Sequence, residues 1–240
     1  MKRTLPVYIT ANYFPRGNRF ILIKYLFLFL LSSFLIVTTT WSQSDPAYLK
    51  TITDRSVKIV NTLSVTDSSV YNKAVQSLVQ QYSALNKIQE ENKTATDLLK
   101  QQGLSADETA ARLKKQEEKK AADLQLLHTS FLTGLQQLLS PEQVDLVKDG
   151  MTYRIFPITY AAYQDMIPEL TAAQKAKIVD WLKEAREQAM DAESSDKKHA
   201  VFGKYKGRIN NYLSAEGYDL KKATEDWQKR IKERNKPTLS

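Results

Sequence analysis

Apolar residues recur through most of the chain at steps of three and four, the spacing that places them on one face of an α-helix. The pattern begins after Asp45-Pro46, a capping side chain followed by proline, which together favour a helix start. The first apolar stripe comprises Leu49, Ile52, Ile59, Val60 and Leu63. Because no stretch of useful length alternates as a strand would, we predict an all-α fold, a bundle of about seven helices with one long antiparallel helical hairpin.

The hairpin is expected over residues 68–139. The segment Val65-Thr66-Asp67-Ser68 ends the preceding stripe and caps its first helix, Gly103-Leu104-Ser105 forms the turn, and a capping box at Ser105 opens its second helix. The apolar positions that pack its base are Ala74, Val75, Leu78, Tyr82, Leu85, Ile88, Leu124, Leu127, Phe131, Leu135, Leu138 and Leu139. The tip, around 92–118, is expected to project into water. Its Lys-Lys-Gln-Glu-Glu-Lys-Lys run is either a solvated face with i,i+4 ion pairs or an electrostatic docking site.

Residues 140–235 are expected to form the C-terminal helical part that carries the candidate site. Two of its helices begin with the same pattern, Leu-[Ser/Thr]-x-x-Gln, at Ser140 and at Thr171. In each, the hydroxyl can cap backbone amides, the glutamine three residues on can reach back to the cap amide, and the preceding leucine can act as a staple. Two well-made helix starts account for this pattern without any further role.

The segment between these two starts, residues 151–168, is rich in aromatic residues. Gly150 is predicted to end the preceding helix as a C-cap, and Pro157 and Pro168 are predicted to bound a short helix. The aromatic residues are Tyr153, Phe156, Tyr160 and Tyr163. They serve either as core packing or as the wall of a pocket that offers phenol hydroxyls to a ligand.

After a helix over 172–192, the helix over 196–214 contains residues that are poor helix formers: Gly203, Gly207, Asn210 and Asn211. Each glycine costs roughly 1 kcal/mol relative to alanine in a helix interior, and each asparagine about half of that. The two glycines are four apart and therefore form one bare strip. The strip allows close approach either of another helix or of a ligand. Gly217 ends this helix, and Asp219 caps the last one.

The first 43 residues have the pattern of a signal peptide. They hold five Lys and Arg and no acidic residue, and an apolar run over 21–37 is followed by small residues near Ser42. From Tyr25 to Val37 the run is 13 residues long, which is short for a membrane span of about 20 residues. Cleavage near Ser42, with no stable membrane anchor afterwards, is therefore expected in preference to an uncleaved N-terminal anchor. The protein is then periplasmic or secreted. Without cysteine, its fold is held by the core rather than by disulfides.

The net charge of +8 belongs largely to that leader, because residues 44–240 carry 30 Lys and Arg against 27 Asp and Glu. No basic-aromatic motif is present either, so no nucleic-acid partner is expected. The two histidines, His128 on an apolar stripe and His199 near a helix start, fit no metal-ligand spacing. We expect neither a metal nor a cofactor. No nucleophile elbow or phosphate loop occurs. Carboxylates that could form a glycosidase pair are Asp165, Glu184, Glu187 and Asp191.

The stretch from Leu139 to Trp227 resembles a family of unknown function found among secreted proteins of Gram-negative, polysaccharide-degrading bacteria. The segments that carry the resemblance are Ser140–Tyr153, Leu170–Lys175, Glu184–Met190 and Lys204–Leu213. The resemblance implies sugar binding and carries over no catalytic residue. The two Leu-[Ser/Thr]-x-x-Gln starts are also similar to those of the Spy/CpxP periplasmic chaperones, which are small helical cradles for unfolded clients. This chain is longer than those chaperones and adds the hairpin and the aromatic segment.

The first hypothesis is therefore a domain that binds a saccharide, with stacking tyrosines and polar groups that meet hydroxyls or an acidic sugar. The candidate ligand-binding residues are Tyr153, Arg154, Tyr160, Tyr163, Arg186, His199, Tyr205, Arg208, Asn210 and Asn211. We expect these groups to converge on one concave site. The second hypothesis is a chaperone-like protein with an exposed apolar patch for protein clients. The third is a glycan-active enzyme with two carboxylates facing each other across a pocket.

Overall fold

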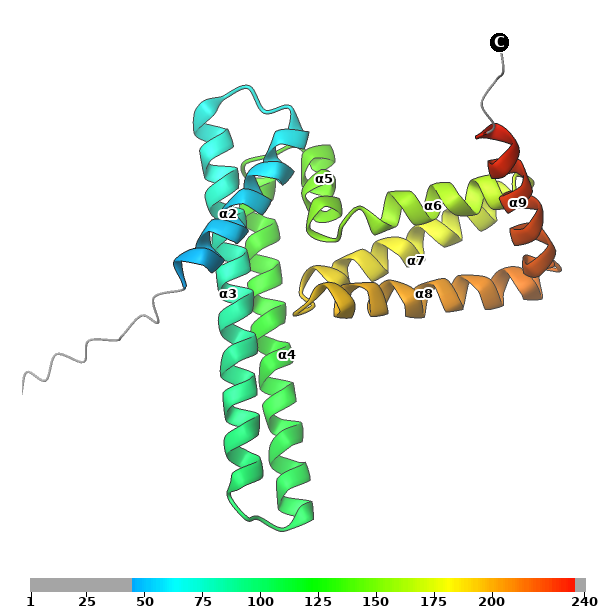
Figure 1. The fold of residues 1–240 in the computed structure, drawn as a ribbon. Helices are drawn as coiled ribbons and strands as arrows, with labels where there is room; N and C mark the ends of the chain where they lie inside the picture. The colour runs from blue at the N-terminus through cyan, green and yellow to red at the C-terminus, as the bar shows by residue number, and fades with distance from the viewer. Residues whose placement is uncertain (1–44, 236–240) are drawn as a thin grey trace, which may run out of the picture. The chain divides into compact units, whose positions relative to one another are not determined.

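The computed structural model describes residues 45–235, and within this range the chain forms eight α-helices, one 3-10 helix and no strand. The predicted all-α helical bundle is confirmed (Figure 1). The predicted signal peptide over 1–43 and the predicted frayed tail over 236–240 lie outside the described residues. Among residues 45–235, no helix combines the length and the apolar character needed to cross a membrane.

The helices follow the predicted order closely. Their bounds are α2 Pro46–Val60, η1 Asn61–Leu63, α3 Ser68–Gln101, α4 Ala106–Gln136, α5 Pro141–Met151, α6 Ile155–Met166, α7 Ala172–Met190, α8 Ser195–Ala215 and α9 Leu220–Arg234. Capping explains most of the starts, because the side chains of Asp45, Asp67 and Asp219 each accept hydrogen bonds from backbone amides of the following turn. The left-handed Gly217 follows the end of α8, as expected.

Helices α3 and α4 form the predicted antiparallel hairpin (Figure 1). Toward its tip the two helices are joined by polar contacts. The side-chain amide of Asn92 accepts a hydrogen bond from Gln116 and donates one to Glu117, both at 3.1 Å. Because a hydrogen bond contributes only about 1 kcal/mol net, the hairpin depends on its apolar base for most of its stability.

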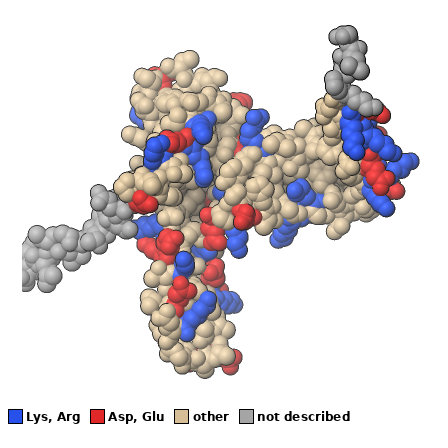
Figure 2. Space-filling model, viewed as in Figure 1, with Lys and Arg blue, Asp and Glu red and all other residues tan. Residues whose placement is uncertain are grey.

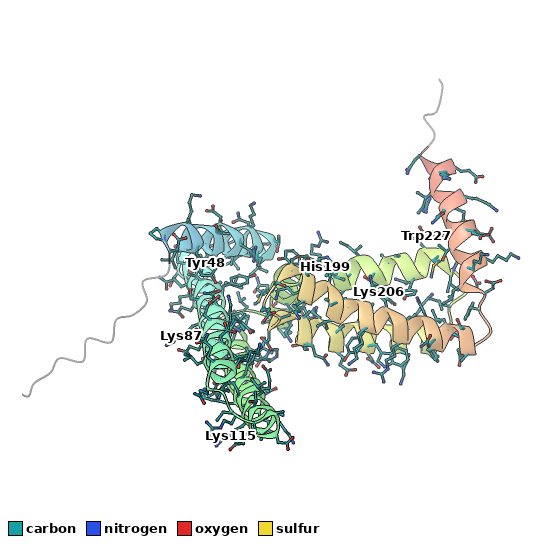
Figure 3. The ribbon with its side chains drawn as sticks, turned by 60° about the horizontal axis from the view of Figure 1, so that its bottom comes forward. Tyr48, Lys87, Lys115, His199, Lys206 and Trp227 are labelled. Carbon is teal, nitrogen blue, oxygen red and sulfur yellow. The ribbon has the colours of Figure 1, made fainter. Side chains whose placement is uncertain are left out.

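The charged run near the hairpin tip has the features of a solvated face. Exposed i,i+4 ion pairs join Lys114 to Glu118 at 3.9 Å and Lys119 to Asp123 at 2.6 Å. Acidic and basic side chains are mixed along the face of the hairpin drawn in Figure 2, and Lys115 extends away from it in Figure 3. Pairs of this kind contribute a few tenths of a kcal/mol each, which supports helix formation and solubility.

Two buried clusters hold the helices together. The first, which includes Leu78 and Leu135, lies where α2 and α5 pack on the base of the hairpin. The second, which includes Ile178 and Phe202, lies among α6, α7 and α8, with α9 at its edge. Helix α5 contacts α7, and these contacts join the two clusters.

The two repeated helix starts form capping boxes, at Ser140 with Gln143 and at Thr171 with Gln174. Each glutamine also bonds to a distant segment. Gln143 donates to the carbonyl of Leu63 at 2.9 Å, and Gln174 donates to the Glu216 carboxylate at 3.1 Å. These contacts give the pattern a structural role, because one side chain both starts a helix and fixes it against a neighbour.

Two local predictions were wrong. Gly150 is not a C-cap, since α5 continues through Met151. A Cβ atom at position 150 would lie 2.8 Å from Cγ1 of Ile59, so this glycine is needed for the close approach of α2 and α5. Pro157 does not bound α6 but lies in its first turn. Proline fits there because amides of the first turn have no partner within the helix.

Gly203 and Gly207 face open space, because a Cβ atom at either position would meet no atom within 4 Å among the described residues. Close packing of α8 against another helix within residues 45–235 therefore does not explain them. We expect the double variant Gly203→Ala/Gly207→Ala to raise the unfolding free energy by about 1.5 to 2 kcal/mol through helix propensity alone. Urea unfolding monitored by circular dichroism measures the change.

Gly150→Ala is the matched control for the two exposed glycines. It brings the same gain in helix propensity, but its new methyl group displaces a buried isoleucine, and overpacking costs about 1 to 3 kcal/mol. We therefore expect Gly150→Ala to lower stability. If the Gly203→Ala/Gly207→Ala variant unfolded at a lower urea concentration than the parent, the added methyl groups would have to clash with other atoms.

Candidate functional site

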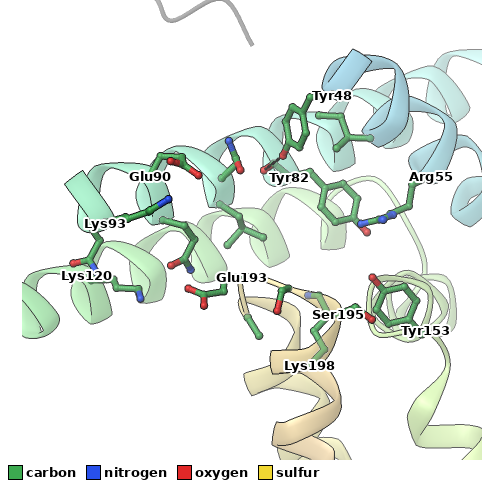
Figure 4. Close-up of a pocket in the computed structure, with 17 residues that line it drawn as sticks. Tyr48, Arg55, Tyr82, Glu90, Lys93, Lys120, Tyr153, Glu193, Ser195 and Lys198 are labelled. Carbon is green, nitrogen blue, oxygen red and sulfur yellow. Dashed lines mark hydrogen bonds between the residues drawn. The ribbon is translucent and has the colours of Figure 1, made fainter. Parts of the chain in front are cut away.

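A cleft of about 460 Å³ lies among α2, α3, α4, the turn between α5 and α6, and the loop between α7 and α8 (Figure 4). Side chains of four chemical kinds line it. The phenols are Tyr48, Tyr82 and Tyr153, the cations Arg55, Lys93, Lys120 and Lys198, the carboxylates Glu90 and Glu193, and the amides Asn86, Gln89 and Asn92. Ser194 and Ser195 complete the polar lining.

Arg55 lies between two tyrosine rings at one end of the cleft. Its guanidinium carbon is 5.5 Å from the ring centroid of Tyr82 and 6.0 Å from that of Tyr153. Cation–π contacts of this kind orient a guanidinium and leave its N–H edges available. No ion pair joins Arg55 to a carboxylate of residues 45–235, so its positive charge is available to a ligand.

The hydroxyl of Tyr82 is buried and has no hydrogen-bond partner among the described residues. Burial raises the pKa of this phenol to about 12, and the nearby positive charge of Arg55 acts in the opposite direction. Arg55 is thus close enough to the Tyr82 hydroxyl to influence it. The Tyr48 hydroxyl donates to the backbone carbonyl of Tyr82 at 3.1 Å, and this hydrogen bond holds α2 against α3.

The backbone of the α5–α6 turn places Tyr153 at the cleft. Tyr153 and Arg154 are consecutive left-handed residues, with φ of 57° and 56°. This conformation costs roughly 1 to 2 kcal/mol for each residue other than glycine. The amide of Arg154 offsets part of the cost by donating to the carbonyl of Asp149 at 2.7 Å. Strained backbone of this kind is often found at functional sites.

Lys198 is a buried cation, with only 5% of its surface exposed. Its ammonium donates to the carbonyls of Ala189 and Met190, at 2.8 and 2.9 Å, which are in the last turn of α7. Burial lowers the pKa of Lys198 to about 8, Asp191 opposes this shift, and Arg55 adds to it. Two of the three ammonium hydrogens are therefore in use, and the third is available toward the cleft that Lys198 lines.

Of the ten predicted ligand-binding residues, the structure brings Tyr153 and His199 to this place. Tyr153 lines the cleft and is 39% exposed. His199 stacks on it, with ring centroids 5.9 Å apart, and lies at the start of α8 (Figure 3). Its Nδ1 is 2.8 Å from the carbonyl of Ser195, so Nδ1 carries the proton.

The other eight candidates do not line the cleft, so the expected convergence on one concave site is wrong. Arg186 is 2% exposed and bonds to Asp145 and Asp149. Three of the remaining candidates are engaged within the C-terminal helices: Tyr163 donates to Asn210 at 2.6 Å, and Tyr205 accepts from Gln188 at 2.7 Å. Tyr160 packs on the second cluster, and Arg208 lies over the ring of Trp181. Arg154 and Asn211 are exposed.

The sequence reasoning missed Tyr48, Arg55, Tyr82 and Lys198 as site residues. Lys198 could have been recognised from its spacing, since it lies four residues before Phe202 and therefore on the same, buried face of α8. A lysine on such a face must find polar partners. Arg55 and Tyr82 carried no such sign, because their proximity depends on how α2 packs on α3.

The model of a family described as protein of unknown function (DUF3826) matches residues 49–233. The chain belongs to this family. The match covers α3 to α8 completely and most of α2 and α9, including nearly the whole lining of the cleft. A search of the curated proteins finds no match to the chain. The cleft of this DUF3826 chain is therefore interpreted from its own geometry.

Proposed function

We propose that this protein binds a saccharide in the cleft between the hairpin and the α7–α8 loop, in the periplasm or outside the cell after cleavage of a signal peptide near Ser42. The observation that carries the proposal is the combination of three phenol rings with unpaired polar groups on one concave surface. Sugars are bound in this way, since a ring face stacks on the apolar side of a pyranose while amides and cations meet its hydroxyls.

The size and mixed polarity of the cleft support this proposal. Its volume of about 460 Å³ falls within the range of roughly 300 to 1,000 Å³ that is common for small-ligand sites. The amides of Asn86 and Gln89 lie along the α3 wall, and Ser194 and Ser195 lie on the facing loop. A long polar ligand could thus be bonded from both sides.

Binding of unfolded protein clients has less support. It needs a continuous exposed apolar surface of several hundred Å². The most exposed large apolar side chains among the described residues are Leu98, Leu126 and Ile158, and they lie on three different helices. Catalysis on glycans is favoured by one observation, since the carboxylates of Glu90 and Glu193 both line the cleft.

The proposal is tested by thermal unfolding of the exported, processed protein against a panel of neutral and acidic oligosaccharides. A ligand at 100 times its Kd adds about 2.7 kcal/mol, which raises the melting temperature of a chain of this size by several degrees. We expect at least one saccharide to give such a shift, and Tyr153→Ala to abolish it because the stacking surface is lost.

Tyr212→Ala is the matched control. Tyr212 also packs against a ring, that of Trp181 at 5.4 Å, but it does not line the cleft, so the shift should persist in this variant. Analysis of the bound oligosaccharide after incubation shows whether it is cleaved, and cleavage lost in Glu90→Gln or Glu193→Gln would identify an enzyme. No shift with any saccharide, together with suppression of client aggregation, would replace the proposal by a chaperone-like role.

A further inference from the structure

The lining of the cleft has more cations than carboxylates. Figure 4 shows Glu90 beside Lys93 on α3, away from the end formed by Arg55 and Tyr153. Overall the lining holds four cations and two carboxylates. The cleft therefore carries excess positive charge. Glu90 lies with Lys93 and Lys120 at one end, whereas Arg55 at the other end has no carboxylate paired with it.

The guanidinium of Arg55 is held in place but not neutralised. Contacts with the rings of Tyr82 and Tyr153 fix it, and no carboxylate among residues 45–235 pairs with it. An arginine held by its faces presents the N–H edges that bind a carboxylate or sulfate through two parallel hydrogen bonds. The surrounding tyrosines also lower the local polarity, which strengthens such a pair.

Lys198 is likewise a cation that contacts with the protein hold in place beside the cleft. Its two bonds to carbonyls at the end of α7 position the ammonium, and the third hydrogen remains for an acceptor in the cleft. Arg55 is close enough to lower the pKa of Lys198, and Asp191 offsets only part of the combined effect of burial and this repulsion. An acidic group beside both would remove this repulsion and favour the charged form of Lys198.

We infer that the ligand of this cleft is a saccharide that carries an acidic group, a carboxylate or a sulfate, and that Arg55 and Lys198 bind this group. The inference rests on the proposed saccharide function and specifies it. It replaces the expectation that Arg154 or Arg186 would meet an acidic sugar. Arg186 is already paired with two aspartates, and Arg154 does not line the cleft.

Calorimetric titration of the processed protein with four probes tests the inference: digalacturonic acid, neutral galactobiose, a sulfated galactobiose, and glutarate as an acid without a sugar. We expect at least one of the two acidic disaccharides to bind at least tenfold more tightly than galactobiose. A higher salt concentration should reduce this preference, because exposed charges are screened. Comparison of the uronate with the sulfated sugar shows which anion is preferred.

Arg55→Gln should remove the preference for the acidic sugar, and Arg55→Lys should restore part of it. Arg208→Gln is the matched control, since Arg208 is also an exposed arginine over a ring, 4.6 Å from the centroid of Trp181, and lies outside the cleft lining. Arg55 is an exposed residue that forms no ion pair among residues 45–235, so its replacement should not impair folding.

The possible failures can be told apart. Equal affinity for neutral and acidic disaccharides would overturn the acidic specificity and leave the saccharide function standing. Glutarate binding as tightly as digalacturonic acid would overturn the saccharide function while the anion site remained. No binding of any probe would overturn both, and a preference that survives in Arg55→Gln would overturn the assignment of Arg55.

Discussion

Replacement of Arg186 by methionine is expected to lower the unfolding free energy by about 3 kcal/mol. Arg186 on α7 is 2% exposed, and it holds Asp145 at 2.6 Å and Asp149 at 2.7 Å, both on α5. It also lies 5.2 Å from the ring centroid of Phe156. Methionine can fill much of the space but cannot pair with the carboxylates, so the half-buried Asp149 would be left without its cation.

The state of Asp149 explains the size of this effect. Burial raises the pKa of this carboxyl, and the hydrogen bond and charge of Arg186 act against the shift. Without Arg186, burial is unopposed by its principal partner, and removing one member of a buried pair typically costs about 3 to 5 kcal/mol. We take the lower end, because Asp145 is half exposed and can regain water. The melting temperature should fall by roughly 6 to 12 °C for a chain of this size.

Arg208→Met provides the comparison. The ion pair of Arg208 with Glu184 is 3.6 Å long and exposed on both sides, so its loss should cost less than about 1 kcal/mol. Asp149→Asn combined with Arg186→Met should recover part of the lost stability, because the unpaired charge is then absent. If Arg186→Met costs no more than Arg208→Met, the pair does not hold α5 to α7.

The helices of this chain could be predicted because their starts are local features. Asp67, Ser105, Ser140 and Thr171 each bond to amides within three residues, and the apolar spacing shows which face is buried. No knowledge of tertiary structure is required for either. The hairpin could then be predicted as well, since two long helices joined by a short turn must lie antiparallel.

The site was harder to predict because its residues come from segments far apart in the sequence. Arg55 and Lys198 line one cleft only because α8 begins beside the base of the hairpin, next to α2. Tyr153 could be predicted because it belongs to the aromatic-rich segment between the two helix starts. Its left-handed conformation could not be foreseen, since a tyrosine rarely adopts it.

Arg186 shows why a polar residue within the predicted C-terminal helical part need not belong to a binding site. Its partners Asp145 and Asp149 are four residues apart and therefore share one face of α5, which is visible in the sequence. That this face meets α7 is not visible. The same limit applies to Gly203 and Gly207. The sequence is compatible with both helix packing and ligand approach at these positions, and only the structure shows that a Cβ atom there would meet no described atom within 4 Å.

The free energy of unfolding is expected to fall by about 2 kcal/mol as the pH rises from 6.5 to 8, because His128 is charged in the folded protein. His128 on α4 is 14% exposed, with Nδ1 2.8 Å from Asp191 and Nε2 3.4 Å from Glu187. Hydrogen bonds from His128 to these two carboxylates, opposed by burial, raise its pKa to about 9. In the unfolded chain the pKa is near its ordinary value of about 6.5.

The direction follows from these two pKa values. A raised folded-state pKa means that the stabilisation is complete below pH 6.5 and is lost as the pH rises through about 9. At acidic pH, stability is limited by Glu187. Burial raises the pKa of this carboxyl, but its hydrogen bonds with His128 and Lys148 and the charges of Lys148 and Arg186 together outweigh burial, so its pKa in the folded protein is lowered. Its contribution is present above its unfolded pKa and is lost as the pH falls through the lower folded value. Lys198, with a pKa lowered to about 8, makes stability rise again between pH 8 and its ordinary pKa.

Urea unfolding at several pH values between 6.5 and 8 isolates the histidine term. His128→Gln should be less stable than the parent at pH 6.5 and should show little change across this range, so that the two proteins converge toward pH 8. His199→Gln is the control, because His199 is exposed and its Nδ1 bonds only to its own helix. A parent slope that persists in His128→Gln would show that another group titrates. Since Asp191 precedes the loop that lines the cleft, loss of this pair at high pH would also loosen the facing wall of the proposed binding site.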